Sequence, residues 1–191
     1  KKMVESLNEY VENLIIDTKK SKELSAGANL AGDVTQEFKL EKEFSQKIGW
    51  LDFISKGVFQ WIQMSSNQNI KEFKMIDSWI VRQFKNEYNP VHMHGGHVSG
   101  AGFLKVPKTL GKYVQDEKDR VKHYAGGTLN LIHGSKQFLS KSTFQIKPEV
   151  GDFYFFPNYM MHTVYPFKNT DEERRSISFN AFVDQSIYDT F

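Results

Sequence analysis

The feature that most constrains the fold is a succession of short segments, rich in aromatic and β-branched residues, that begins after Asn69. Glycine, proline or polar turns separate these segments at short intervals. This pattern is typical of a β-sandwich or barrel, in which short strands are joined by turns. The segments are KMIDSWIVRQF, VSGAGFLKV, GTLNLI, STFQI, DFYFFP, HTVYPF and RSISFNAFV.

The residues before this succession have a helical pattern. Over residues 1–20, apolar side chains recur at helical spacing, with acids early and lysines late, as the helix dipole prefers. A Ser-, Ala- and Gly-rich stretch over 21–40 predicts irregular structure. A second helix is predicted from about Leu40 to Met64, with a buried face that comprises Phe44, Ile48, Leu51, Val58, Trp61 and Ile62. We therefore expect helices packed on one side of an antiparallel double-sheet barrel.

The length of 191 residues predicts one domain over 1–191, with helical support in 1–68 and a barrel core in 69–191. A polar insertion is expected near 107–126. The net charge of +2, with lysines and acids interspersed, gives no indication of nucleic-acid binding. The absence of cysteine excludes a disulfide scaffold and is compatible with a reducing cytosol. No apolar run approaches a membrane span, so we expect a cytoplasmic protein with neither nucleic acid nor membrane as partner and leave its oligomeric state open.

Three of the six histidines lie within six positions, in the segment HMHGGH. In a strand, alternate side chains share a face, so His92 and His94 are able to point to the same spot. Paired neutral imidazoles suit iron, zinc, copper or nickel. His97 lies beyond two glycines, which leaves its direction undefined. The alternatives are a plain surface loop and a set of hydrogen-bonded histidines.

The best candidate for a third ligand is His162. It follows the aromatic strand DFYFFP and a break at Pro157 and Asn158. A histidine just after such a turn lies at the mouth of a sheet, where binding groups tend to be placed. The alternative is a histidine at the core edge that bonds to a backbone carbonyl.

The last strand segment has two chemically distinct faces. A polar row buried in an apolar barrel is costly without partners, and a bound carboxylate would satisfy an arginine in such a row. The alternative is a solvent-facing edge strand, with Arg174 paired to Glu172 or to a neighbouring residue. Alternation alone does not show which face of the strand points inward, so Arg175 remains a second candidate for binding the carboxylate. One face carries Arg174, Ser176, Ser178 and Asn180, and the other carries Arg175, Ile177, Phe179 and Ala181.

Taken in order, these motifs resemble the iron(II)/2-oxoglutarate-dependent oxygenases. They are most similar to a prolyl-4-hydroxylase-like branch found in bacteria and tailed phages. The more specific part of the resemblance is FFPNYMMH followed by RRSISFN, and NLAGDVTQEFKL also resembles an upstream segment of that branch. The resemblance implies a mainly β fold with flanking helices: a double-stranded β-helix (a jelly roll, cupin-like) buttressed by the N-terminal helices. The matching positions are His92 to His94, Ser99 to Phe103, Gly151 to His162, and Arg174 to Asn180.

The resemblance also implies an activity. Such an enzyme uses Fe(II), 2-oxoglutarate and O2, with ascorbate as a further candidate, and converts 2-oxoglutarate to succinate while it hydroxylates its substrate. A peptide, with proline as the family default, or a small molecule is the expected substrate. By position, His92 and His162 are metal ligands, and Arg174 with Ser176 holds the far carboxylate of 2-oxoglutarate. No catalytic residue is expected beyond the metal centre.

The chain departs from the family pattern at two positions. His94 occupies the place of an Asp or Glu in the wider superfamily. Three outcomes remain open: His94 binds the metal, which we favour because His is the commonest ligand type; it points away; or a carboxylate such as Asp152 replaces it. Phe103 stands where many relatives have a tyrosine that contacts 2-oxoglutarate, so Lys105, on the same strand parity, or Tyr154 is expected to compensate.

Some roles and functions stay open. Arg82 and Phe84 are expected either to line the pocket or to serve structure. Two other functions compete with the oxygenase: a cupin-type metalloenzyme with three histidine ligands and no use of 2-oxoglutarate, and a non-catalytic jelly-roll binding module. If the gene belongs to a phage, the expected location is the cytoplasm of the host.

Overall fold

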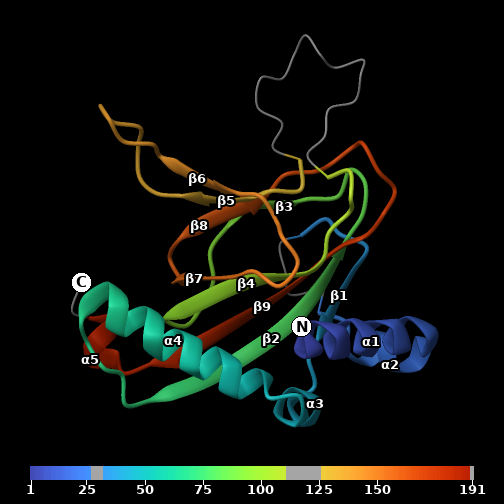
Figure 1. Ribbon diagram of the computed structural model, residues 1–191, viewed down its shortest axis with the longest axis horizontal. Helices are drawn as coiled ribbons and strands as arrows, with labels where there is room; N and C mark the ends of the chain where they lie inside the picture. The colour runs from blue at the N-terminus through green and yellow to red at the C-terminus, as the bar shows by residue number, and fades with distance from the viewer. Residues whose placement is uncertain (27–31, 111–125, 190–191) are drawn as a thin grey trace.

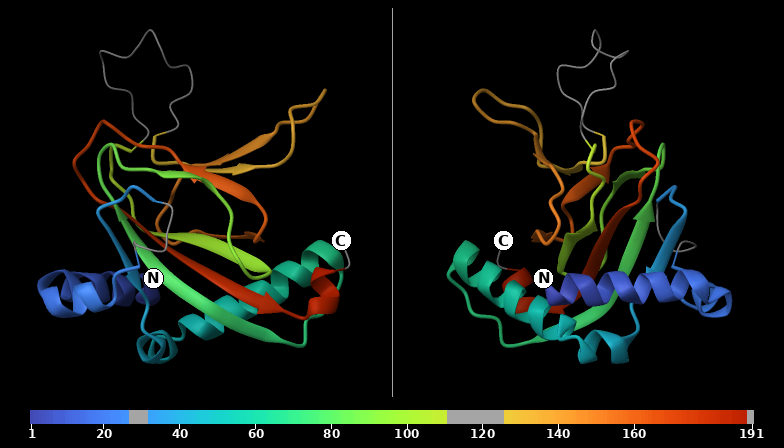
Figure 2. Two further views of the ribbon diagram at one scale, coloured as in Figure 1. Left: turned by 180° about the vertical axis from the view of Figure 1, so that it is seen from behind. Right: turned by 45° about the vertical axis from the view of Figure 1, so that its right-hand side comes forward.

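Two antiparallel sheets face one another, and helices cover the outer face of the larger sheet (Figures 1 and 2). The computed structural model describes residues 1–26, 32–110 and 126–189. The larger sheet has the order β1-β2-β9-β4-β7, and the smaller sheet has the order β3-β8-β5-β6. This architecture confirms the predicted jelly roll with flanking helices. Most of the polar insertion expected near 107–126 lies outside the described residues.

The strands are short, as the turn spacing of the sequence predicts. Among the strands in the described ranges, only β2 and β9 extend to ten residues or more, and they pair with one another along almost their whole length. The larger sheet contains β1 (Gln36–Lys39), β2 (Phe73–Gln83), β4 (Val98–Lys105), β7 (Phe153–Pro157) and β9 (Arg174–Val183). The smaller sheet contains β3 (Asn89–His92), β5 (Leu129–Ile132), β6 (Thr143–Ile146) and β8 (Met161–Val164).

Five helices occur in the described ranges, and their breaks have local causes. The carboxylate of Asp17 accepts hydrogen bonds from the backbone N–H groups of Lys19 and Lys20, so a new helix starts where the first one ends. The single helix predicted over 40–64 is two helices, because Gly49 adopts a φ of 75° between them. The helices are α1 (Lys2–Ile16), α2 (Thr18–Glu23), α3 (Lys42–Lys47), α4 (Trp50–Ser66) and α5 (Gln185–Tyr188).

The break at Gly49 changes which residues are buried. The buried face of α4 begins at Trp50 and continues through Ile54, Val58 and Ile62, at helical spacing. Leu51, which the prediction placed on that face, is only half-buried. The prediction was wrong there because it assumed one continuous helix.

The described residues form two apolar clusters of unequal size. The larger cluster joins α1 and α4 to the outer face of the larger sheet, to which β9 contributes Ile177, Phe179 and Ala181. The smaller cluster lies between the sheets and has four buried members: Phe103, Leu129, Ile146 and Val164. Elsewhere the inner face combines buried apolar residues, Trp79 and Val81, with polar side chains such as Ser176.

A strand occurs where irregular structure was predicted. Residues 21–40 were predicted to be irregular, yet β1 lies within them and pairs antiparallel with β2, with Glu37 opposite Val81. The N-terminal third therefore contributes a strand to the larger sheet as well as helices. No helix in the described part of the chain is long and apolar enough to cross a lipid bilayer.

Candidate metal centre

Three imidazoles meet between the sheets. His92 ends β3 and pairs in register with His162 of β8, and His94 follows two residues later. One ring nitrogen from each side chain lies within 4.8 Å of the other two. The Nε2 atoms of His94 and His162 are 3.1 Å apart. Since a metal–nitrogen bond is about 2.1 Å long, adjacent ligand nitrogens around one ion lie roughly 3 Å apart. The group therefore fits a transition metal.

Backbone carbonyls set the orientation of two of the rings. The Nδ1 atom of His92 lies 2.7 Å from the carbonyl oxygen of Pro90, and Nδ1 of His162 lies 2.9 Å from that of Met160. A carbonyl only accepts hydrogen bonds, so Nδ1 carries the proton in both rings. The lone pair of a neutral ring is then on Nε2, the form that a metal binds.

Burial keeps the imidazoles of His94 and His162 neutral. Burial, together with the neighbouring His162 and His92, lowers the pKa of His94 to about 3. Burial likewise lowers the pKa of His162 to about 4, against the opposing hydrogen bond to Met160. Neutral rings are the protonation state that a metal requires, so no proton has to leave before binding near neutral pH.

The third histidine of the motif does not join the group. Gly96 has a φ of 88°, and a Cβ there would lie 2.9 Å from the carbonyl oxygen of Ala181. The chain turns away at this point, and His97 is buried on another side, where its ring stacks on Tyr188 with centroids 4.2 Å apart. Nδ1 of His97 lies 3.0 Å from the carbonyl oxygen of Val183. His97 is thus part of the packing around α5.

No carboxylate oxygen from the described residues joins the three imidazoles. Asp152, the candidate replacement for His94, is exposed, and its Oδ2 accepts a hydrogen bond of 3.4 Å from the hydroxyl of Tyr154. His133 is exposed as well, and His123 lies outside the described residues.

Arg174 lies on the inner face of β9 and shares a cavity with the imidazoles. Its side chain is 2% exposed. Nε donates to the carbonyl oxygen of Gly127 at 3.0 Å, Nη1 donates to the hydroxyl of Ser176 at 3.3 Å, and the guanidinium lies over the ring of Phe103. Among the described residues no carboxylate pairs with it, and burial lowers its pKa to about 10. A buried guanidinium without a counter-ion is a ready site for an anion.

The expected alternative for Arg174 was an ion pair with Glu172, and the structure places Glu172 elsewhere. The Glu172 carboxylate is exposed and accepts from the backbone N–H of Lys108. Of the two faces of β9, the one with Arg174, Ser176 and Ser178 lines the cavity.

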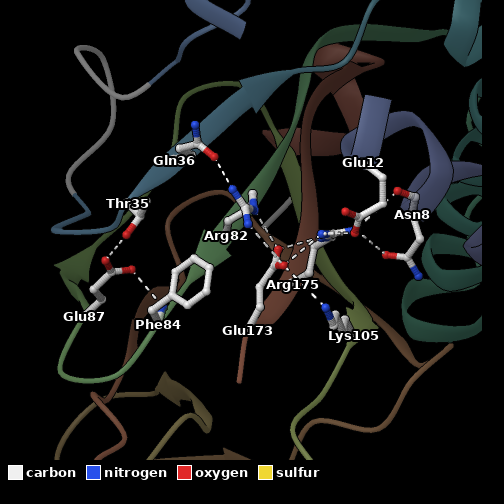
Figure 3. A network of polar contacts seen from close by, with 10 residues as sticks. All are labelled: Asn8, Glu12, Thr35, Gln36, Arg82, Phe84, Glu87, Lys105, Glu173 and Arg175. Atoms are coloured by element: carbon white, nitrogen blue, oxygen red, sulfur yellow. Dashed lines mark hydrogen bonds and ion pairs between the residues drawn. The ribbon is translucent and has the colours of Figure 1, made fainter. Parts of the chain in front are cut away.

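Arg175 points the other way, toward the helices (Figure 3). Its guanidinium bonds Glu173 through Nε at 2.8 Å, and it bonds Glu12 of α1 through Nη2 at 2.8 Å. Nη1 donates to the side chain of Asn8 at 3.0 Å. These partners occupy Arg175 fully, so it is a structural residue that joins α1 to β9.

Lys105 belongs to the same outer network (Figure 3): its Nζ lies 3.6 Å from Glu173. The prediction placed it on the cavity side with Phe103 by strand alternation. The pairing between β4 and β9 shifts between these two residues, so that Phe103 lies opposite Ser176 and Lys105 opposite Arg175. This irregularity reverses the alternation, and we correct the prediction: Lys105 does not reach the cavity.

The other residues considered for the pocket also lie outside it. Arg82 bonds Glu173 at 2.8 Å and stacks on Phe84, on the outer face. Phe103 is 1% exposed, lies beneath Arg174, and meets Tyr154 edge-on with centroids 6.2 Å apart. The hydroxyl of Tyr154 is turned toward Asp152, so it does not replace the tyrosine hydroxyl missing at Phe103.

Sequence reasoning missed several residues that line the cavity. Trp79 packs against His94 with ring centroids 5.4 Å apart, and its position on β2 follows from the alternation of that strand. Glu37 was missed because β1 was missed. The cavity is lined by Gly32, Glu37, Trp79, Val81, Asn89, His92, His94, Ala101, Leu129, His162, Val164, Arg174, Ser176 and Ser178.

Comparison with known proteins identifies the family. Residues 77–180 match the family described as "Putative 2OG-Fe(II) oxygenase", which covers more than half of the chain. The chain belongs to the 2OG-Fe(II) oxygenases. No curated protein matches this oxygenase by sequence. The predicted family, enzyme class and cofactors, Fe(II) and 2-oxoglutarate, are confirmed, and an oxygenase of this kind acts on a substrate with O2.

Solved structures share the fold of the oxygenase at low sequence identity. A Pseudomonas putida prolyl-4-hydroxylase is 14% identical, with a TM-score of 0.56 over 95% of this chain and 85% of that chain. A Trichoplax adhaerens prolyl hydroxylase, in complex with a hypoxia inducible factor peptide, is 12% identical, with a TM-score of 0.58 over 100% and 83%. HygX from Streptomyces hygroscopicus, with nickel, 2-oxoglutarate and hygromycin B bound, is 13% identical, with a TM-score of 0.59 over 97% and 80%.

Proposed function

We propose that this oxygenase hydroxylates a peptide, with proline as the first residue to test, or a small molecule, and that His92, His94 and His162 hold its iron. Arg174 and Ser176 hold the far carboxylate of 2-oxoglutarate. The observation that carries this assignment is the shared cavity, which a buried guanidinium without a counter-ion lines together with three imidazoles. Phe103 has a packing role beneath Arg174. Lys105 pairs with Glu173 outside the cavity and takes no part in cofactor binding.

The bound iron and 2-oxoglutarate supply the oxidising chemistry, with ascorbate as a candidate reductant. The chain itself positions them. Gly127 and Ser176 fix the guanidinium of Arg174, and the ring beneath it prevents the side chain from folding back. The rings of Trp79 and Phe156 lie against His94 and His162 and exclude water from the ligand side of the centre.

His94 as the third ligand gives this site one negative charge fewer than a site with two histidines and a carboxylate. Support for the assignment comes from the short distance between its Nε2 and that of His162. A three-histidine metalloenzyme that does not use 2-oxoglutarate would leave the buried charge of Arg174 unexplained. A non-catalytic binding module would explain neither that charge nor the group of three imidazoles. Family membership and Arg174 together favour the oxygenase.

The choice between a peptide and a small molecule has support on each side. The Trichoplax structure holds a peptide fragment, and the HygX structure holds hygromycin B. Both proteins share the fold of this chain, which supports either class.

We further propose that residues 1–191 form a single oxygenase domain in the cytoplasm, or in the host cytoplasm for a phage gene, with neither nucleic acid nor membrane as partner. The near-balanced charge and the cysteine-free composition support this.

Binding and turnover of 2-oxoglutarate test the assignment of Arg174. Purified protein with Fe(II) is expected to convert 2-oxoglutarate to succinate, and Arg174→Ala is expected to weaken 2-oxoglutarate binding by about 10- to 100-fold, since a charge-assisted hydrogen bond contributes about 1.5–3 kcal/mol. Calorimetric titration of the Mn(II)-loaded protein measures the affinity. Lys105→Met is the matched control and should leave the affinity unchanged. Equal affinity of the wild type and Arg174→Ala would contradict the assignment.

A further inference from the structure

A second buried charge lies in the same cavity. Glu37 of β1 is 3% exposed, and its Oε2 has no hydrogen-bond partner among the described residues. Burial raises the pKa of this carboxyl to about 7, and no described cation lowers it. An unpartnered buried carboxylate oxygen costs free energy, so a position of this kind requires an explanation.

The register of the sheet directs Glu37 inward. Glu37 pairs with Val81, Val81 with Ser176, and Ser176 with Phe103, which forms one row across the inner face of the larger sheet. The next residue, Phe38, belongs to the apolar cluster under the helices. Glu37 is therefore fixed in the cavity by the same alternation that places Ser176 there.

The backbone at Gly32 packs closely against this end of the cavity. A Cβ at Gly32 would lie 3.3 Å from Oε1 of Glu37 and 2.6 Å from Oδ1 of Asn89. Any side chain at this position would push against both groups. The carboxylate thus lies in a shaped end of the cavity and is not a mobile surface group.

The two charges in the cavity do not neutralise one another. Among the described residues that line it, Glu37 is the only acid and Arg174 is the only residue with a permanent positive charge. They form no ion pair with one another, and neither has another ionic partner in the described ranges. A cavity with a separate cation and a separate carboxylate fits two ligand groups of opposite charge.

We propose that Glu37 is a subsite for a basic nitrogen of the substrate, an ammonium or a guanidinium, which it binds beside the metal centre. The proposal rests on the proposed function, because it takes Arg174 to be occupied by 2-oxoglutarate and leaves Glu37 to face the substrate. A cation is favoured over a neutral donor because only a cation recovers the free energy lost when the carboxylate is buried in its ionised form. Glu37 is no metal ligand here, since its oxygens lie outside the group of three imidazoles.

A pair of matched probes tests the charge requirement. N-acetyl-lysine methylamide and N-acetyl-norleucine methylamide share a four-carbon stem and differ in the terminal ammonium. Each is titrated onto protein loaded with Mn(II) and 2-oxoglutarate, and the paramagnetic broadening of the probe's NMR signals reports binding near the metal. The wild type is expected to bind the lysine probe at least about tenfold more tightly than the norleucine probe.

Glu37→Gln keeps the shape and the hydrogen-bonding oxygen but removes the charge. In this variant the preference for the lysine probe should disappear, while the affinities for Mn(II) and 2-oxoglutarate stay at wild-type values. Glu43→Gln, which removes the same charge from an exposed position on α3, should retain the preference. Equal broadening of the two probes by the wild type, including none for either, overturns the proposal. A loss of Mn(II) or 2-oxoglutarate affinity in Glu37→Gln also overturns it, since Glu37 would then serve the cofactors.

The two proposals fail in different ways. If the wild type does not bind 2-oxoglutarate in the presence of Mn(II) and without any probe, the proposed function fails. The probe pair is then applied to the Mn(II)-loaded protein alone. If the Mn(II)-loaded protein prefers the lysine probe and Glu37→Gln loses this preference, the proposed subsite is supported. If the wild type shows no such preference, the subsite is refuted as well.

Discussion

At the scale of single residues, the three histidines of HMHGGH differ in role because of the backbone between them. His92 and His94 share a face, and the turn at Gly96 places His97 in another part of the molecule. The sequence pattern was sufficient to predict the first pair. It was insufficient to predict where the His97 side chain points. A glycine with positive φ changes the direction of the chain, and the spacing of residues in the sequence does not show the new direction.

Removal of the His94 imidazole tests its role as a ligand. His94→Ala is expected to weaken Mn(II) binding by at least about 100-fold, because even the loss of a residue that only orients a ligand costs about 10- to 100-fold. His97→Ala, as a control, should lower the melting temperature through lost packing and leave the affinity unchanged. Calorimetry measures the affinity. Wild-type metal affinity in His94→Ala would show that His94 is not a ligand.

Glu37 makes a prediction on stability that is independent of any ligand. Its pKa is about 7 in the folded protein and near 4.5 when exposed, so between these values the folded state holds a proton that the unfolded state has released. Stability is therefore lost as pH rises through this window, and the loss is complete above the folded pKa. Glu37→Gln does not ionise and avoids the loss.

The free energy of unfolding of Glu37→Gln should consequently exceed that of the wild type by a margin that grows by about 2–3 kcal/mol between about pH 5 and about pH 8. Denaturant unfolding of the metal-free proteins at the two pH values measures this margin. For Glu43→Gln the margin should not grow. A margin for Glu37→Gln that is constant with pH would mean that its carboxyl is not buried in solution.

At the scale of the elements, alternation predicted the two faces of β9 but failed on β4. β9 is paired on both sides along its length, so its polar residues stay on one face and its apolar residues on the other. In β4 one extra residue before Lys105 reverses the order. Such an irregularity depends on the partner strand, which a single strand sequence does not show. β1 was missed for a related reason. It has four residues and is polar at both ends, so the alternation of polar and apolar residues is too short to indicate a strand.

The contact between α4 and β7 depends on the absence of a side chain at Gly57. A Cβ there would lie 2.3 Å from the ring of Phe155, which is held by Trp61, Phe153 and Phe179. Gly57→Ala should therefore lower the free energy of unfolding by about 1–3 kcal/mol, although alanine favours a helix by about 1 kcal/mol. Thermal denaturation measures the effect. Gln60→Ala, on the exposed side of α4, should not destabilise, and a stabilised Gly57→Ala would show that the helix does not pack as closely as described.

At the scale of the whole molecule, the unequal apolar clusters explain which parts of the fold were predictable. The large cluster beneath the helices follows from amphipathic patterns in α1, α4 and β9, which the sequence displays. The space between the sheets is different, because the apolar cluster described there has four buried members, and polar groups share the cavity with Trp79 and Val81. Those polar groups gain their partners from distant strands or from ligands, which local patterns do not report.

Ligands should therefore stabilise the whole molecule. Mn(II) is expected to raise the melting temperature, and 2-oxoglutarate to raise it again, each by several degrees when present at about 100 times its dissociation constant, where binding contributes about 2.7 kcal/mol. Arg174→Ala should lose only the second increment, and His92→Ala should lose both. Differential scanning fluorimetry measures the increments. A 2-oxoglutarate increment that survives in Arg174→Ala would place that ligand elsewhere.

The position of Glu37 on β1 has a consequence for how this enzyme could be redesigned. The imidazoles come from β3, β8 and the turn after β3, and the guanidinium comes from β9, whereas Glu37 comes from the outermost strand of the larger sheet. The proposed recognition residue and the proposed metal and 2-oxoglutarate sites thus come from segments that are far apart in the chain. Substitutions at Glu37 alone would vary recognition without touching the imidazoles, Arg174 or the buried Phe38 beside it, which makes this position the first choice for changing what the enzyme accepts.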